Sequence, residues 1–325
     1  MAKAKAILVR KTGGPEVMEY IDVDVPEPAA GQVLIRHAAV GLNFIDVYYR
    51  TGLYPAQPPF VLGVEGAGVV EKLGEGVTDL NVGDRVAYTG QLGAYSERRV
   101  VPAERLVKIP KDVDDKTAAG MMLKGLTAHY LLHKTYRVGP GDTILVHAAA
   151  GGVGLILCQW AKFLGATVIG TVGSDAKAKL AKEHGCDHPI VYTREDFVAR
   201  VKEITGGNGV PVVYDSVGKD TFEKSLDCLR PLGLMVSFGN SSGAVPPISL
   251  LILSQKGSLF VTRPTLAHYV ARRDDLDEAA QELFKAVRTG VVQIQVGKTY
   301  PLKDAAKAHT DLESRRTTGS TVLLP

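Results

Sequence analysis

The chain has 325 residues, 45% of them hydrophobic, and its 38 basic residues nearly balance 35 acidic ones, for a net charge of +3. This composition excludes a disordered chain, and the even mixing of charge argues against nucleic acid or an anionic membrane as a partner. The opening MAKAKAILVR fits neither a signal peptide nor a membrane span, so we expect a cytoplasmic protein. Three separated cysteines, Cys158, Cys186 and Cys228, are expected to be small buried residues rather than disulfide partners or zinc ligands.

Residues 6–110 predict a compact, mostly antiparallel β domain. Short β-like runs alternate there with Gly and Pro, and they read AILVR, QVLIRHAAVG, GAGVVEKLG, GDRVAYT and RLVKIP.

From residue 142 the pattern changes to short apolar runs, each followed by a helical pattern or a loop. The runs are TILVHA, ATVIGTVG, PIVY, VPVVYDSVG, LGLMVSFGN and SLFVT. Five or six such strands predict an α/β unit with a parallel sheet and helices on both faces. After Pro264 we expect one long helix, with apolar residues near helical spacing at Tyr269, Leu276, Ala280, Leu283 and Val287. The tail that follows is expected to return to the first domain.

The stretch HAAAGGVG (147–154) lies between the first of these runs and a helical pattern. A glycine-rich turn that opens a helix exposes backbone N–H groups, which bind a pyrophosphate at the positive end of the helix. Ala149 stands where the dinucleotide pattern would have its first glycine, and Gly151 and Gly154 follow. Because the turn follows a predicted strand within a series of βα units, we favour a dinucleotide site over a tight turn without a ligand.

The end of the second strand favours NADPH over NADH. An acid there would repel a 2′-phosphate, and the turn itself has none, although Asp175 comes one residue after Ser174. Lys177 could reach a phosphate placed over Gly173 and Ser174, and Tyr192 could add a hydroxyl donor. Lys177 taken alone also fits a solvated helix face.

A β-rich domain, a nucleotide domain and a returning tail resemble the medium-chain dehydrogenase/reductase superfamily. In its zinc-dependent members the segment matching VLGVEGAG (61–68) contains Gly-His-Glu, and a cysteine stands where this chain has Asn43. Val64 offers no ligand atom and Asn43 is a poor one, so we expect no metal.

The phrases GLNFIDVYYRTGLYP (41–55), LKGLTAHYLL (123–132), HAAAGGVG and VVYDSVGKDTFEKSLDCLRPLGLMVSFGNSSG (212–243) resemble the zinc-independent quinone oxidoreductases, bacterial relatives of zeta-crystallin. This resemblance implies a GroES-like β-rich catalytic domain at 1–123 and 266–325, and a Rossmann NADPH-binding domain at 124–265. It implies an NADPH-dependent quinone reductase that works without metal. It also implies a homodimer that pairs the Rossmann edge strands near Ser258–Thr262.

The resemblance also assigns site residues. Cofactor contacts are implied at Asn43, Asp46, Thr127, Ala150, Gly151, Gly152, Val153, Gly173, Ser174, Lys177, Tyr192, Phe238, Gly239, Ser241 and Arg315. The catalytic, acceptor-binding residues are implied to be Asn43, Tyr48, Tyr54 and Thr127. Arg316 stands beside Arg315, so which of the two faces the cofactor stays open.

Simpler interpretations stay open for several of these residues. Tyr48 and Tyr54 fit loop packing as well as a pocket, and Asn43 fits a turn. Asp46 fits a cap for a helix that begins at Val47, or a partner for Arg50.

Two other functions compete with quinone reduction. One is reduction of the double bond of an enal or enone, which also needs no zinc. The other is a structural or RNA-binding role, against which the balanced charge argues. His129 and His133 are spaced i, i+4 without the Glu of a metalloprotease motif, and structural or surface roles are favoured for all eight histidines.

Overall fold

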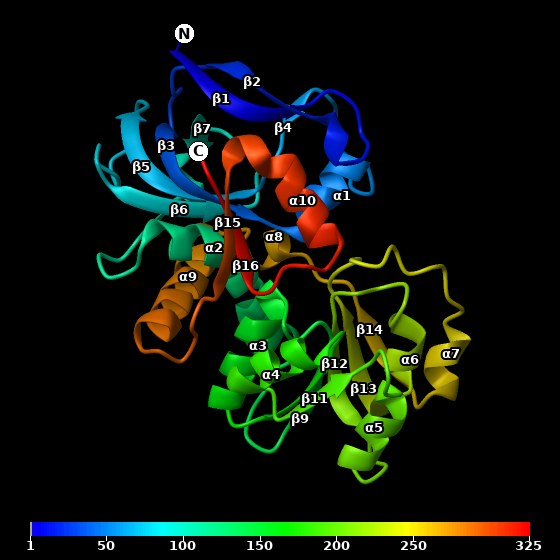
Figure 1. Ribbon diagram of the computed structural model, residues 1–325. Coiled ribbons are helices and arrows are strands. Elements are labelled where there is room, and N and C mark those ends of the chain that lie inside the picture. The colour runs from blue at the N-terminus through cyan, green and yellow to red at the C-terminus, as the bar shows by residue number, and fades with distance from the viewer. Residues whose placement is uncertain (1) are drawn as a thin grey trace. The chain divides into compact units, whose positions relative to one another are not determined.

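The computed structural model describes residues 2–325, which divide into two compact units. Of the described residues, unit 1 contains 2–126, 270–288 and 294–325, and unit 2 contains 127–269 and 289–293. The elements of both can be followed in Figure 1. Among residues 2–325, no helix combines the length and the apolar character that crossing a membrane requires.

Unit 1 is built on a seven-stranded sheet. Its strand order is β15 (Val296–Pro301), β16 (Ser320–Leu324), β3 (Gln32–Leu42), β5 (Glu65–Leu73), β6 (Arg85–Thr89) and β8 (Val107–Lys108), and β7 (Arg98–Pro102) also pairs with β3. Only β15 and β16 pair in parallel, so the predicted antiparallel character is confirmed. A second sheet has the order β2 (Met18–Val25), β1 (Ala2–Val9) and β4 (Phe60–Val61).

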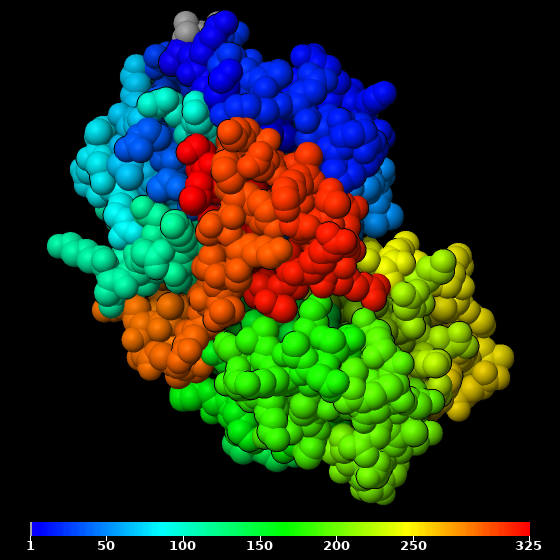
Figure 2. Space-filling model, in the orientation of Figure 1, coloured from blue at the N-terminus to red at the C-terminus, as the bar shows by residue number. Residues whose placement is uncertain are grey.

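The core of unit 1 draws on both ends of the chain. Along β3, Val33 and Ile35 are fully buried while Arg36 faces solvent, as expected for a strand with one covered face. Tyr300, near the end of the chain, and Leu323 of β16 belong to the same hydrophobic cluster. Figure 2 shows the orange and red residues of the chain end packed beside the blue N-terminal residues. Helices α1 (Phe44–Thr51), α9 (Arg273–Arg288) and α10 (Ala305–Glu313) complete the unit.

The single long helix expected after Pro264 is wrong. The chain forms a short helix α8 (Leu266–Tyr269) and then a separate helix α9. Tyr269 does not continue the apolar face of α9, because its ring stacks on that of Tyr130 with a centroid distance of 4.2 Å. Two acidic residues, Asp274 and Asp275, occupy the first turn of α9, where the helix dipole favours negative charge.

Unit 2 is built on a six-stranded parallel sheet. Its order is β11 (His188–Val191), β10 (Thr167–Val172), β9 (Thr143–Val146), β12 (Val210–Asp215), β13 (Leu229–Ser237) and β14 (Phe260–Thr262). The central strands are nearly continuous apolar runs because both faces of the sheet are covered. Helices α3 (Gly152–Phe163) and α4 (Asp175–Glu183) lie on one side, and α5 (Phe197–Ile204) and α6 (Phe222–Leu226) on the other (Figure 1). The predicted α/β fold is therefore confirmed.

Helix α2 (Asp115–Tyr130) carries the chain from the first unit into the second, and α7 (Leu251–Gln255) precedes β14. The three cysteines are free and buried, as expected. Cys158 and Cys186 nevertheless lie side by side, and the hydrogen bond between their thiols, together with burial, raises the pKa of Cys158 well above its ordinary value.

Buried His37 makes the stability of the fold depend on pH. Its Nδ1 lies 2.6 Å from the Ser96 carbonyl oxygen and its Nε2 lies 2.8 Å from the Tyr88 hydroxyl. Burial lowers the pKa of His37 from 6.5 to about 3. Below pH 6.5 the His37 ring therefore binds a proton in the unfolded chain but not in the folded chain. The contribution of His37 to the free energy of unfolding is present above pH 6.5 and is lost below it.

We predict that lowering the pH from 7 to 5 reduces the free energy of unfolding, with about 2 kcal/mol of the loss due to His37 alone. Urea unfolding of His37→Gln should show a correspondingly flatter dependence on pH than the unaltered chain. The exposed His268, changed to Gln, is the control and should leave the slope unchanged. Equal slopes for His37→Gln and the unaltered chain would contradict the prediction.

Candidate functional site

The glycine-rich turn of unit 2 connects the end of β9 to the start of α3. Gly151 is the N-cap of this 12-residue helix, and Ala148 takes a left-handed φ of 53°. A Cβ on Gly154 would lie 2.3 Å from the Ala148 carbonyl oxygen, so the first turn of the helix packs against the loop too closely for any side chain. The N-cap and the first residue of α3 are the glycines 151 and 152, so no side chain of theirs stands before the first N–H groups of the helix.

The side chain of His147 anchors this turn to neighbouring elements. Its Nδ1 lies 2.8 Å from the Thr171 hydroxyl of β10, and its Nε2 lies 2.9 Å from the Ser225 hydroxyl of α6. The ring is 1% exposed, and burial lowers its pKa. His147 therefore has the structural role expected of it and ties the end of β9 to both neighbouring elements.

The end of β10 is the second part of the site. Gly173 faces Tyr192 so closely that a Cβ there would lie 3.0 Å from the Tyr192 hydroxyl oxygen. Ser174 is the N-cap of α4, and its hydroxyl accepts a hydrogen bond of 3.4 Å from the backbone N–H of Lys177. The predicted cofactor contacts at residues 173, 174, 177 and 192 thus gather around one helix start.

Asp175, the nearest acid to this helix start, is already paired. Its carboxylate accepts two hydrogen bonds from the Arg194 guanidinium, at 2.5 and 2.7 Å, and this pairing lowers its pKa. The sequence did not reveal the pair, because Arg194 comes 19 residues later. The acid at this strand end is therefore neutralised by a bidentate partner.

The end of β13 is the third part of the site and carries Phe238, Gly239 and Ser241. The backbone N–H of Phe238 donates to the Asp215 carbonyl oxygen at 2.8 Å, and that of Ser241 donates to the Ser216 carbonyl oxygen at 3.1 Å. Because the carboxyl ends of parallel strands share one edge of a sheet, the predicted contacts after β9, β10 and β13 lie along the same edge.

This edge fits a dinucleotide. Unpaired N–H groups at a helix start bind a diphosphate, and the glycines leave room for the close approach of a ligand. The helix start at Ser174 adds backbone and hydroxyl donors without an uncompensated negative charge.

The other group of predicted site residues lies at the start of α1 in unit 1. Helix α1 begins at Phe44 with Asn43 as its N-cap, so the expected start at Val47 is wrong. The Asp46 carboxylate caps the helix from its third position, because its Oδ2 accepts the Asn43 N–H at 2.8 Å and the Tyr95 hydroxyl at 2.9 Å. Burial raises the pKa of Asp46 to about 7, against the opposing effect of these two hydrogen bonds.

Asp46 does not pair with Arg50, which was one of the alternatives that the sequence left open. The Arg50 guanidinium, 1% exposed, donates to both carboxylate oxygens of Glu313 at 2.8 and 2.9 Å, and to His309 Nδ1 at 3.0 Å. This contact joins α1 to the end of α10 within unit 1.

The Asn43 side chain is also held. Its Nδ2 donates to Glu65 Oε2 at 2.7 Å, and Glu65 Oε1 accepts the Leu123 backbone N–H at 2.7 Å. Lys124 Nζ lies 3.5 Å from the same carboxylate. Sequence reasoning missed Glu65 and Lys124, although the signal was present as single charged residues inside the apolar runs VLGVEGAG and MMLKGLTAHY.

Tyr48 and Tyr54 pack on each other, with ring centroids 5.1 Å apart, and the Tyr54 N–H donates to the Tyr48 carbonyl oxygen at 3.0 Å. The loop-packing interpretation therefore describes a real contact, and the acceptor-binding role stays a prediction. Thr127 is buried in α2 and belongs to unit 2, whereas Arg315 follows α10 in unit 1 with a left-handed φ of 59°. Their approach to the cofactor also stays a prediction.

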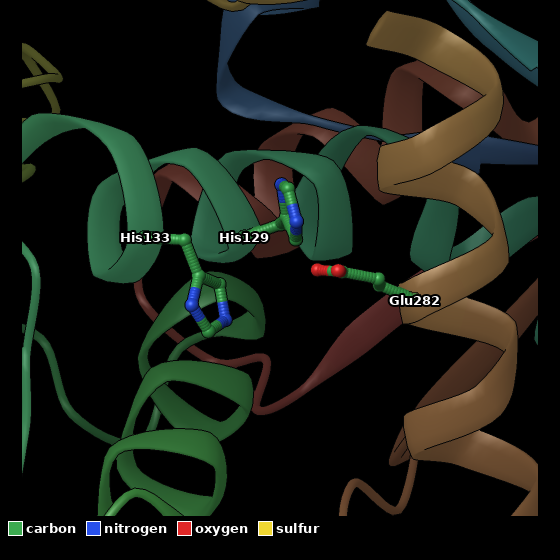
Figure 3. Close-up of side chains that lie close together, drawn as sticks. All are labelled: His129, His133 and Glu282. Carbon is green, nitrogen blue, oxygen red and sulfur yellow. The ribbon is translucent and has the colours of Figure 1, made fainter. Parts of the chain in front are cut away.

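His129 lies in the last turn of α2, and His133 lies in the π-helical segment Leu131–Thr135 that follows it (Figure 3). Their ring centroids are 5.0 Å apart, and both rings contact Trp160 of α3, at 5.8 and 5.3 Å. This ring cluster fits the structural role expected for the pair. Glu282, also drawn in Figure 3, belongs to α9 of unit 1.

Parts of both units match known protein families. Residues 29–111 match the alcohol dehydrogenase GroES-like domain, and residues 152–285 match a family described as zinc-binding dehydrogenase. A quinone oxidoreductase of Pseudomonas aeruginosa is 56% identical over 99% of this chain and 100% of its own length. A 2-haloacrylate reductase of Burkholderia is 52% identical over 98% of both chains. The crystal structure of the Escherichia coli quinone oxidoreductase complexed with NADPH matches with a TM-score of 0.97 and 52% identity, over all of both chains.

A zinc ion does not fit the positions where zinc-dependent relatives carry ligands. Val64 is buried and has only hydrocarbon to offer, and the Asn43 amide nitrogen is a donor already bound to Glu65. The side chains present therefore disagree with the zinc implied by the family description.

We predict that Gly154→Ala weakens the binding of NADPH about tenfold or more, because the added methyl group displaces the first turn of α3 from the loop. Gly139→Ala, in the same unit, meets no atom within 4 Å and should bind NADPH as the unaltered chain does. Fluorescence titration measures both affinities, and thermal unfolding shows that each variant is folded. Unchanged affinity in Gly154→Ala would mean that this turn does not hold the diphosphate.

Proposed function

The chain belongs to the quinone oxidoreductases of the medium-chain dehydrogenase/reductase superfamily, and we propose that it is an NADPH-dependent quinone reductase that works without metal. The family resemblance seen in the sequence is thereby confirmed. The observation that carries the activity is full-length identity of 52–56% to several proteins named quinone oxidoreductase.

Unit 2 binds the cofactor in this proposal. The α3 start at Ala150, Gly151, Gly152 and Val153 would hold the diphosphate, and Phe238, Gly239 and Ser241 would line the same sheet edge. When bound, NADPH supplies the hydride. Ser174, Lys177 and Tyr192 would take the 2′-phosphate, which is supported by the Ser174 cap and by the Arg194 partner that neutralises Asp175.

Unit 1 contributes donors for the acceptor. A quinone accepts electrons readily, so the protein has mainly to orient it and to stabilise the negative charge that develops on its oxygen. The Asn43 amide and the hydroxyls of Tyr48 and Tyr54 are the groups we propose for this, with Thr127 of α2 at the cofactor. Asp46 supports them by capping helix α1, whose N-cap residue is Asn43.

We propose that Arg315 reaches the cofactor from the tail, as the family resemblance implies. The Arg316 guanidinium beside it lies 3.8 Å from Asp311 of α10.

Reduction of a conjugated double bond is the second candidate. It is favoured by the 52% identity to a protein named 2-haloacrylate reductase over 98% of both chains. Both reactions deliver hydride to a conjugated acceptor, and neither requires a zinc ion.

The test is steady-state consumption of NADPH and NADH with 1,4-benzoquinone, 1,2-naphthoquinone and 2-chloroacrylate. We expect turnover of both quinones with a preference for NADPH, and Lys177→Ala should reduce that preference roughly tenfold, as expected for a lost charge-assisted contact. Background rates with both quinones would refute the proposal, and much faster turnover of 2-chloroacrylate would select the second candidate.

We further propose a homodimer that pairs the edge strands β14. Among residues 2–325, β14 pairs only with β13, and Phe260 is 60% exposed. Leu250, the N-cap of α7, and Leu251, its first residue, are 76% and 62% exposed, and Figure 2 shows this yellow segment at the margin of unit 2. An apolar edge of this kind favours pairing with a second copy.

Sedimentation velocity should therefore give a dimer, and Phe260→Lys should shift it to monomer, because a charge on an edge strand opposes pairing. Val82→Lys changes an equally exposed residue of unit 1, at 65%, and should leave the dimer intact. A monomeric unaltered protein disposes of the proposal.

The cytoplasm is the location we propose. Three free cysteines are compatible with a compartment that keeps thiols reduced. Cell fractionation tests this location.

A further inference from the structure

We propose that Glu65 is a positioning residue for the reduction, and that its carboxylate fixes the orientation of the Asn43 amide. The inference rests on the proposed function, in which Asn43 contacts the cofactor and the acceptor. Glu65 is not one of the residues proposed to donate hydrogen bonds to the acceptor. It would influence the reaction through Asn43.

The Glu65 carboxylate is a built receptor for three donors. The residue is 0% exposed at the start of β5. Its Oε2 accepts Asn43 Nδ2 at 2.7 Å, its Oε1 accepts the Leu123 N–H at 2.7 Å, and Lys124 Nζ lies 3.5 Å from Oε2. A carboxylate only accepts hydrogen bonds, so each partner must turn an N–H group toward it.

This arrangement decides which way the Asn43 amide points. An asparagine amide can turn over, which exchanges the positions of its oxygen and nitrogen with little change in shape. A turned amide would bring Asn43 Oδ1 to the place of Nδ2, 2.7 Å from a carboxylate oxygen, and two acceptors would face each other. Glu65 therefore leaves one orientation and fixes which amide atoms remain for a ligand.

The backbone of Asn43 is fixed as well. Its N–H is bound by the Asp46 carboxylate at 2.8 Å, so the helix start and the side chain are each held by a buried acid. With both ends held, the amide has little freedom to reorient, and little freedom has to be lost when a ligand binds.

Two neighbours of Glu65 accommodate its buried carboxylate. Lys124, also buried, donates to the Leu42 carbonyl oxygen at 3.2 Å and supplies the opposite charge. On β3, a Cβ at Gly41 would lie 2.2 Å from Glu65 Oε2, so the neighbouring strand leaves space for the carboxylate. Because a buried ion pair contributes little net stability, its role is better explained by the geometry it imposes.

The experiment is a double-mutant cycle in the full-length protein with NADPH and 1,4-benzoquinone. Glu65→Gln replaces one acceptor oxygen by a donor, and should lower kcat about tenfold or more while changing the KM for NADPH less than about threefold. Asn43→Ala removes the amide. The double variant should then be no slower than Asn43→Ala within about twofold, because Glu65 acts through Asn43.

Glu71→Gln is the matched control. It makes the same substitution on the same strand, where Glu71 binds Arg36 and Arg98, and it should leave kcat unchanged. If Glu65→Gln slows the Asn43→Ala enzyme as much as it slows the unaltered one, the carboxylate acts independently of the amide and the inference is overturned.

Two further measurements keep the outcomes separate. If Glu65→Gln does not fold, Glu65→Gln with Lys124→Gln removes both buried charges, and the same cycle is measured on that neutral pair. If the unaltered protein reduces no quinone, the proposed function fails. The cycle is then read from the fluorescence of bound NADPH, where coupling between positions 43 and 65 supports the positioning role and additive effects refute it.

Discussion

The free N–H groups at the start of α3 are the constraint on which unit 2 depends. In the proposed function they bind a diphosphate, which requires that residues 151 and 152 bring no side chain between them and the ligand. Both are glycines and meet this condition, and Gly154 lets the helix pack on the loop, since a Cβ at 154 would lie 2.3 Å from the Ala148 carbonyl oxygen. His147 then fixes the loop to β10 and α6 through the hydroxyls of Thr171 and Ser225, so buried polar contacts hold the turn in place.

Unit 1 solves a different problem, the placement of the Asn43 amide at the start of α1, of the Tyr48 phenol within that helix and of the Tyr54 phenol after it. It does so with buried charges. Asp46 holds the Asn43 backbone, Glu65 holds its side chain, and Arg50 ties the same helix to Glu313 of α10. Each of these groups costs desolvation energy. Glu65 and Arg50 have partners on other elements, whereas Asp46 is bonded through Oδ2 and its buried Oδ1 has no hydrogen-bond partner. The polar network therefore contributes order more than stability.

The parts of the fold that could be predicted from the sequence are those that depend on patterns of neighbouring residues. The parallel sheet and the turn at 147–154 follow from apolar runs and glycine spacing. The contacts that could not be predicted join distant residues. Glu65 binds Asn43 across 22 positions, and Asp175 binds Arg194 across 19. The break between α8 and α9 was missed because Tyr269 has helical spacing but stacks on Tyr130 instead.

The charges around Asn43 also bear on the choice between a quinone and a haloacrylate. Glu65 and Lys124 form a pair of opposite charges, and Asp46, which binds the Asn43 N–H, has its pKa raised to about 7 by burial. Near neutral pH this site is neutral or negative. A quinone is uncharged when it binds, whereas an acrylate arrives as an anion and gains further negative charge during reduction. Because the described donors near Asn43 provide hydrogen bonds without a net positive charge, the electrostatics of unit 1 favour the uncharged acceptor.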